Sequence, residues 1–132
     1  MNAKAEVRRM KDEMQGKSDL KERTKQLALQ IIRLYERLPK MTVAQTIGRQ
    51  VLRSAMSVGA HYREAQRAKS DADFINTMEG GLQELDETAY WLELLGEAGI
   101  VKQEILAPLC KETDELIAIF VTIVTKVKAR RK

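Results

Sequence analysis

Apolar residues in this chain recur every three or four positions, a spacing that places them on one face of an α-helix. The pattern is present in four separate runs, which cover residues 20–38, 43–62, 74–95 and 109–127. The runs are separated by residues that stop helices, among them Pro39 and the pair Gly96 and Gly99. Helical periodicity in nearly every part of the chain leaves little sequence for strands. It therefore predicts an all-helical fold.

The predicted helix boundaries rest on capping residues. A side chain that accepts a hydrogen bond, followed three residues later by an acidic or amide side chain, is typical of a helix start. Three such pairs precede the first three runs: Asp19 with Glu22, Thr42 with Gln45, and Ser70 with Asp73. We expect the fourth helix to begin between Lys102 and Pro108, with residues 102–106 either part of it or a separate short turn.

Four helices of about 20–28 residues joined by short connections predict an antiparallel up-and-down four-helix bundle. A length of 132 residues corresponds to one domain, and we assign residues 18–132 to the bundle. Residues 1–17 are an N-terminal extension, either a short mobile helix or a loose segment. A helix there would carry Val7, Met10 and Met14 on its apolar face and end at Gly16.

The segment from Leu116 to Val124 is apolar on nearly every side, and such a helix needs more partners than one small bundle supplies. Small residues recur along the second helix at intervals that allow another helix to approach closely. The two features predict a homo-oligomer interface formed by Gly48, Ala55, Gly59, Leu116, Phe120 and Val124. The alternative is that both segments belong to the core of one subunit. The apolar segment is too short to span a membrane, so no membrane partner is expected.

Basic and acidic residues are unevenly distributed along the chain, whose net charge is +4. Residues 40–69 contain six basic residues and one acidic residue, whereas residues 70–100 contain eight acidic residues and no lysine or arginine. Clustered cations on one helix suit contacts to the phosphates of RNA or DNA. The predicted nucleic-acid-binding residues are Arg49, Arg53, Arg63, Arg67 and Lys69, together with Lys128, Arg130 and Arg131. The alternative is that Arg49 and Arg53 pair with acids of the third helix, such as Glu84 and Glu87.

Residues that catalysis or metal binding would need are scarce. The chain has one histidine, His61, and one cysteine, Cys110, on different predicted helices. A di-iron bundle needs two Glu-x-x-His motifs, and Gly80-Gly81 lacks the lysine of a phosphate-binding loop. We therefore expect no catalytic residue, no metal site and no cofactor. The first residues contain no apolar stretch of signal-peptide length, which favours a cytoplasmic protein.

Segments 49–67, 69–74, 78–88 and 91–99 resemble a known signature. It is that of the four-helix bundle proteins encoded in intervening sequences of bacterial 23S ribosomal RNA genes, and the resemblance covers about residues 20–128. The family pattern is matched by Gln50, Arg53, Ser54, Ser57, Val58, Glu64, Ser70 and Phe74. The sequence departs from the pattern at His61, Arg63, Ala65 and Arg67-Ala68, where the family has Asn, Ala, Gly and Gly-Arg.

The resemblance implies a homopentamer, often with a basic central channel or face, and no established enzymatic activity. The family is distantly similar to the accessory variability proteins of diversity-generating retroelements, which implies nucleic acid and a reverse transcriptase as partners. The expected function is that of a non-enzymatic homo-oligomer that binds nucleic acid through basic surfaces. The alternative is a protein-interaction scaffold with no nucleic-acid role, in which an acidic ridge meets a basic partner. That ridge consists of Glu79, Asp86, Glu93 and Glu97.

Overall fold

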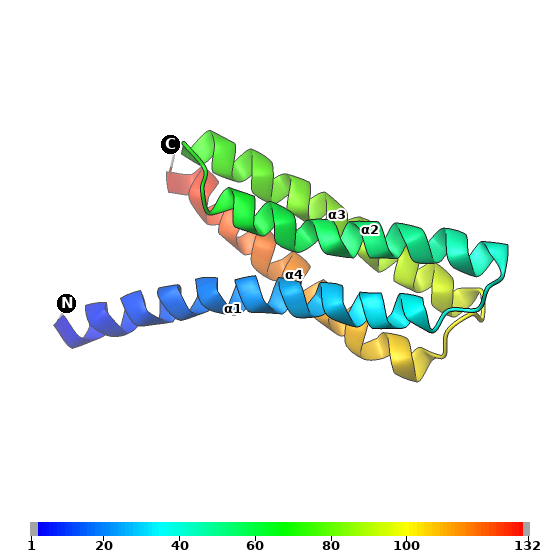
Figure 1. Cartoon of the computed structure of the whole chain (residues 1–132). Helices are drawn as coiled ribbons and strands as arrows, with labels where there is room; N and C mark the ends of the chain where they lie inside the picture. Colours follow the sequence, from blue (N-terminus) through cyan, green and yellow to red (C-terminus); the bar gives the residue numbers. More distant parts are fainter. Residues whose placement is uncertain (1–2, 131–132) are drawn as a thin grey trace.

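The computed structural model describes the backbone of residues 3–130 and the side chains of residues 19–130. The described backbone forms four α-helices and no strand. The helices are α1 (Ala3–Glu36), α2 (Thr42–Ala65), α3 (Asp71–Glu97) and α4 (Gln103–Arg130). Consecutive helices run in opposite directions, as Figure 1 shows. The prediction of an all-helical chain with four helices is confirmed.

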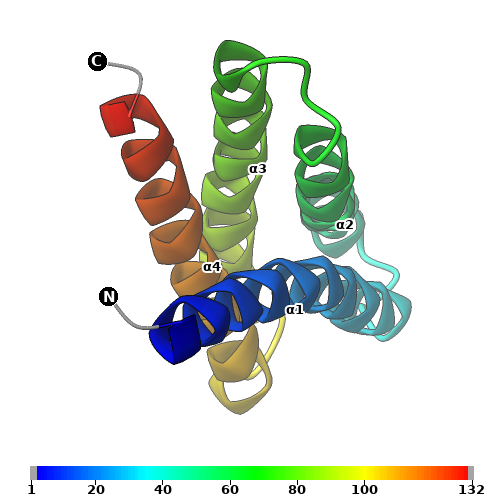
Figure 2. The same ribbon diagram turned by 90° about the vertical axis from the view of Figure 1, so that its left-hand side faces the viewer.

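The core lies between the four helices and consists mainly of aliphatic side chains. Among its fully buried members are Leu27 of α1, Val51 of α2, Leu85 of α3 and Leu116 of α4. The contact between α2 and α3 is the most extensive, and that between α1 and α4 is the smallest. The N-terminal end of α1 and the C-terminal end of α4 lie apart in both views (Figures 1 and 2). The bundle is therefore less closed at that end.

The first helix is one continuous element, which corrects the expected break at Gly16 and the expected start at Asp19. The helix runs from Ala3 to Glu36, and its N-terminal turns extend beyond the other helices (Figure 1). Asp19 lies inside it and pairs with Arg23 one turn later, at 3.7 Å. A glycine inside a helix costs only about 1 kcal/mol relative to alanine. Gly16 therefore does not end a helix when the sequence on both sides favours one.

The start of the second helix differs from the predicted one, whereas that of the fourth falls within the predicted range. Met41 is the N-cap residue of α2 and makes no side-chain capping hydrogen bond, so Thr42 is the first helical residue. The Gln45 side-chain amide donates to the carbonyl of Pro39 at 2.9 Å, outside the helix. The fourth helix begins at Gln103 with no separate turn, so Pro108 lies in its second turn.

The predicted cap of the third helix is confirmed. Ser70 is the N-cap residue, and its Oγ accepts a hydrogen bond from the backbone N–H of Asp73 at 3.1 Å. The Asp73 carboxylate in turn accepts from the backbone N–H of Lys69 at 3.1 Å. At the other end, Gly99 has a φ of 70°, and the N–H of Ile100 donates to the carbonyl of Leu95. This left-handed residue stops the helix where the sequence predicted.

We expect Ser70→Ala to lower the free energy of unfolding by about 1 kcal/mol, because the N–H of Asp73 loses its acceptor. Urea unfolding followed by circular dichroism measures the change. Ser70→Asn is the matched control, since an asparagine retains an acceptor at the cap and should preserve most of the stability. An equal loss in both variants would contradict the capping role.

The residues predicted to form a subunit interface lie inside one subunit instead. Leu116 and Phe120 are completely buried, and Val124 is only 5% exposed. Gly48 and Ala55 are buried as well, and Gly59 lies close to Thr24 of α1. The small residues of α2 thus let α1 approach rather than a second copy. Five of the six residues are therefore buried within the subunit, and Gly59 is half-buried against α1.

A few apolar side chains of the described residues remain in contact with solvent. The most exposed large ones are Met41, Val43, Met56, Tyr90, Ile105 and Val121. Within residues 3–130, no helix is both long enough and apolar enough to cross a membrane.

Candidate nucleic-acid interface

The outward face of α2 carries most of the predicted nucleic-acid-binding residues that the structure describes. Residues on this face alternate in steps of four and three positions: Arg49, Arg53, Met56, Ala60, Arg63 and Arg67. All six are exposed, and Arg67 follows the helix in the turn before α3. Lys69 lies two residues further along the same turn and is exposed too. The helical spacing therefore places most of the predicted cations on one side of the bundle.

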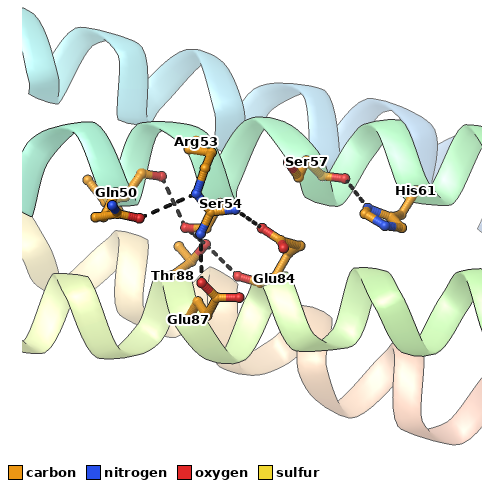
Figure 3. Close-up of polar contacts among 9 residues, drawn as sticks. Gln50, Arg53, Ser54, Ser57, His61, Glu84, Glu87 and Thr88 are labelled. Atoms are coloured by element: carbon orange, nitrogen blue, oxygen red, sulfur yellow. Dashed lines mark hydrogen bonds and ion pairs between the residues drawn. The ribbon is translucent and has the colours of Figure 1, made fainter.

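Arg53 is bound by two acids of the neighbouring helix. Its guanidinium reaches Glu84 at 3.0 Å and Glu87 at 2.6 Å, as Figure 3 shows. Next to it, the hydroxyls of Ser54 and Thr88 form a buried hydrogen bond of 2.8 Å across the same helix pair. Arg53 therefore links α2 to α3, and its charge is neutralised within the subunit, unlike that of the other predicted nucleic-acid-binding residues on this helix.

Two of the predicted C-terminal cations are engaged in the same way. Lys128 contacts Glu79 at 2.7 Å, and Arg130 contacts Asp71 at 3.0 Å. The hydrogen bond with Asp71 and its charge raise the pKa of Arg130. Both pairs hold the end of α4 against α3 rather than leaving the cations for a ligand. Arg131 lies outside the described residues.

Four of the predicted cations remain available, and we call them the α2 cation row: Arg49, Arg63, Arg67 and Lys69. None of them forms an ion pair with a side chain among residues 19–130. The pKa of Glu22 is lowered chiefly by hydrogen bonds from Gln26 and Lys25, and the charge of Arg63 contributes least to this shift. The α2 cation row is therefore an exposed set of positive charges, none of which is held in an ion pair by a described side chain.

His61, at which the sequence departs from the family pattern, packs against the neighbouring helix. Its Nδ1 lies 2.8 Å from the carbonyl oxygen of Ser57, and its ring lies against Gly80. A Cβ on Gly80 would come within 2.9 Å of the imidazole Nε2, so the glycine leaves the space that the ring occupies. The glycine pair of α3 thus serves helix packing.

Cys110 lies on α4 and borders a pocket between α3 and α4. Burial raises the pKa of its thiol, and the charges of Asp114 and Glu93 raise it further. A raised pKa keeps the sulfur protonated and unreactive at neutral pH. Among the described side chains, no group of three or more His, Cys, Asp and Glu residues is placed to hold a metal ion.

The acidic ridge of α3 is partly neutralised. Glu79 pairs with Lys128, whereas Asp86, Glu93 and Glu97 form no ion pair with any side chain of residues 19–130. A hydrogen bond with Glu97, and the negative charge of that residue, raise the pKa of Glu93. The ridge therefore presents uncompensated negative charge on a different helix from the α2 cation row.

A groove that sequence reasoning missed lies where the α2 cation row ends. It has a volume of about 760 Å³ and is bordered by α1, the α2–α3 turn, α3 and the last turns of α4. Lys126 of α4 lies on its edge together with Lys69. The apolar spacing predicts that these segments pack around a core. It gives no sign that they leave a space between them.

These features define a small helical-bundle protein with an exposed row of cations on its second helix. The chain belongs to the 23S rRNA-intervening sequence protein family, whose family model matches residues 17–122. It is also similar to the crystal structure of a protein of unknown function from the S23 ribosomal protein family of Bacteroides thetaiotaomicron VPI-5482. The two chains are 33% identical with a TM-score of 0.77, over 83% of this chain and 97% of that one. A comparison with curated proteins finds no match.

The resemblance to the intervening-sequence family is thereby confirmed. The more distant similarity to retroelement proteins stays a prediction.

Proposed function

We propose that this protein is non-enzymatic and binds RNA or DNA by contacting phosphates with the α2 cation row. The observation that carries the proposal is the contrast between two sets of cations. Arg53, Lys128 and Arg130 are neutralised by carboxylates of α3, whereas the four members of the row are exposed and form no ion pair with the described side chains. Cations that the fold itself does not need are available to a polyanion.

The arrangement of the row suits a sugar–phosphate backbone. Arg49 and Arg63 are 14 positions apart, which corresponds to about 21 Å along an α-helix. A nucleic-acid strand offers several phosphates over that length. Contacts of this kind position a nucleic acid without selecting its sequence, and each one releases bound counterions. The expected binding is therefore independent of sequence and sensitive to salt.

We also propose that the protein assembles into a homo-oligomer. The form that the resemblance implies is a pentamer. The apolar side chains left in solvent away from the α2 cation row, including Ile105 and Val121 of α4, give a second copy surface to cover. A closed ring repeats each cation of the row in every subunit, so a pentamer of this +4 chain would carry about +20. A reverse transcriptase is the protein partner that the resemblance implies, and co-purification with it is the corresponding test.

Native mass spectrometry with and without a 15-nucleotide RNA of generic sequence tests both parts of the proposal. We expect a species heavier than one 15.0 kDa chain, and a further mass increase on adding RNA. Gel retardation should show binding at about 50 mM salt that falls steeply as the salt concentration rises. Absence of binding at about 50 mM salt would overturn the nucleic-acid role. A single 15.0 kDa species at all micromolar concentrations would overturn the assembly.

One observation favours the alternative of a protein-interaction scaffold. Asp86, Glu93 and Glu97 form no ion pair with the described side chains, and the pKa of Glu93 is raised by its hydrogen bond with Glu97 and by the negative charge of that residue. A basic partner surface would neutralise this ridge. The same mass measurement separates the candidates, since a scaffold would assemble without binding RNA.

A further inference from the structure

The groove beside the α2 cation row has an apolar floor. The floor is formed by residues from all four helices: Leu20, Tyr62, Phe74, Ile119, Ile123 and Val127. Phe74, Ile119 and Ile123 are only half-buried, so part of each side chain remains accessible from the groove. The lining residues of the groove include the α2–α3 turn, at the end of the bundle that faces the viewer in Figure 2. The space thus accepts an apolar group from solvent.

The charges around this groove favour a negatively charged occupant. Of the two acids on its edge, Asp71 is paired with Arg130 at 3.0 Å, whereas Asp19 lies 3.7 Å from Arg23, whose guanidinium is bound by Glu112. Lys69 and Lys126 are both exposed, and neither forms an ion pair with a side chain of residues 19–130. With Asp71 and Arg130 paired, two lysines face the single carboxylate of Asp19, so the surplus charge at the groove is positive.

The groove is also continuous with the α2 cation row. Arg67 lies one turn after Arg63, and Lys69 belongs both to the row and to the groove edge. A strand whose phosphates follow the row from Arg63 to Lys69 would therefore arrive at an apolar space. The part of a nucleic acid that fits such a space is a base, since its planar faces are apolar and stack on aromatic rings.

We propose that this groove accepts unpaired bases of a single-stranded nucleic acid, with Phe74 as the stacking ring and with Lys69 and Lys126 contacting the flanking phosphates. The inference rests on the proposed function and adds a preference for single strands. A duplex offers the same phosphates, but its bases are paired and stacked inside the helix. It therefore gains the contacts of the row without those of the groove.

Fluorescence anisotropy on the full chain tests the preference with three probes: a 12-nucleotide oligouridylate, an RNA duplex of the same length and inorganic polyphosphate as a competitor without bases. We expect the oligouridylate to bind about tenfold more tightly than the duplex. Phe74→Leu keeps an apolar side chain of similar size, so the bundle should stay folded by circular dichroism. It should weaken oligouridylate binding by about tenfold and leave competition by polyphosphate unchanged.

Tyr90→Leu is the matched control, because Tyr90 is an exposed aromatic residue of α3 outside the groove. It should leave the affinity for all three probes unchanged. Photocrosslinking of an oligonucleotide that contains 4-thiouridine gives an independent readout. The crosslinked peptides should include residues 70–74 or 119–127, which border the groove.

The outcomes separate this inference from the proposed function. Equal affinity for single strand and duplex, with Phe74→Leu binding like the wild type, would overturn the groove inference and leave phosphate binding by the row intact. Crosslinks confined to residues 49–63 would have the same meaning. Failure of every probe to bind at low salt would overturn both proposals.

Discussion

Replacing Phe120 with alanine is expected to lower the free energy of unfolding by about 3–5 kcal/mol, the range for removing a fully buried aromatic side chain. Phe120 is completely buried, and its ring centre lies 6.1 Å from that of Tyr62. The ring also lies against Gly81 of α3, where its Cε2 is 3.1 Å from the position a Cβ would take. Alanine would therefore leave a cavity between three helices. Urea unfolding followed by circular dichroism measures the loss.

Val121→Ala is the matched control for this prediction. Val121 is the next residue on the same helix but is 44% exposed, so its truncation should cost less than about 1 kcal/mol. The comparison also separates a core role from the interface role that the sequence predicted for Phe120. An unchanged unfolding midpoint in Phe120→Ala, together with a lower assembly mass, would contradict the core assignment.

Reversing the charge of Arg63 and Arg67 to glutamate is expected to weaken RNA binding by about 10- to 100-fold. Both side chains are exposed and form no ion pair with the described side chains, so the double variant should remain folded. The slope of log affinity against log salt should decrease by about two, because two phosphate contacts are lost. Anisotropy titrations at several salt concentrations measure both quantities.

Arg33 and Arg37 provide a matched control at the other end of the bundle. They are also four residues apart and exposed, with one in the last turn of α1 and the other just after the helix. Reversing both changes the net charge by the same amount and should affect RNA binding only slightly. Equal losses in the two double variants would show that net charge alone governs binding, and would contradict a role for the α2 cation row.

Most of the helical framework could be predicted from the sequence. The spacing of apolar residues, the Ser70 cap and the left-handed Gly99 depend on neighbours within about four positions, and α3 begins and ends as predicted. At Gly16 the local sequence predicts a helix end, but α1 continues through this residue. The helix propensity on both sides of that glycine outweighs its small cost.

The candidate site could be predicted only in part. Arg49 and Arg53 look equivalent in the sequence, since both lie on the outward face of one helix. In the structure, Glu84 and Glu87 lie opposite Arg53 alone, so one arginine holds two helices together and the other faces solvent. Which acid lies opposite which base depends on how far two helices are shifted along one another, and no local pattern encodes that shift.

The sequence by itself determined that this chain forms four helices, where most of them end, and on which helix the basic residues are concentrated. The tertiary structure alone decided that Leu116 and Phe120 are core residues, which cations remain unpaired, and that a groove opens between the helix ends. The reason is physical. Helix formation depends on hydrogen bonds and contacts within one turn, whereas burial, ion pairing and cavities depend on side chains that are distant in the sequence and are brought together by helix packing.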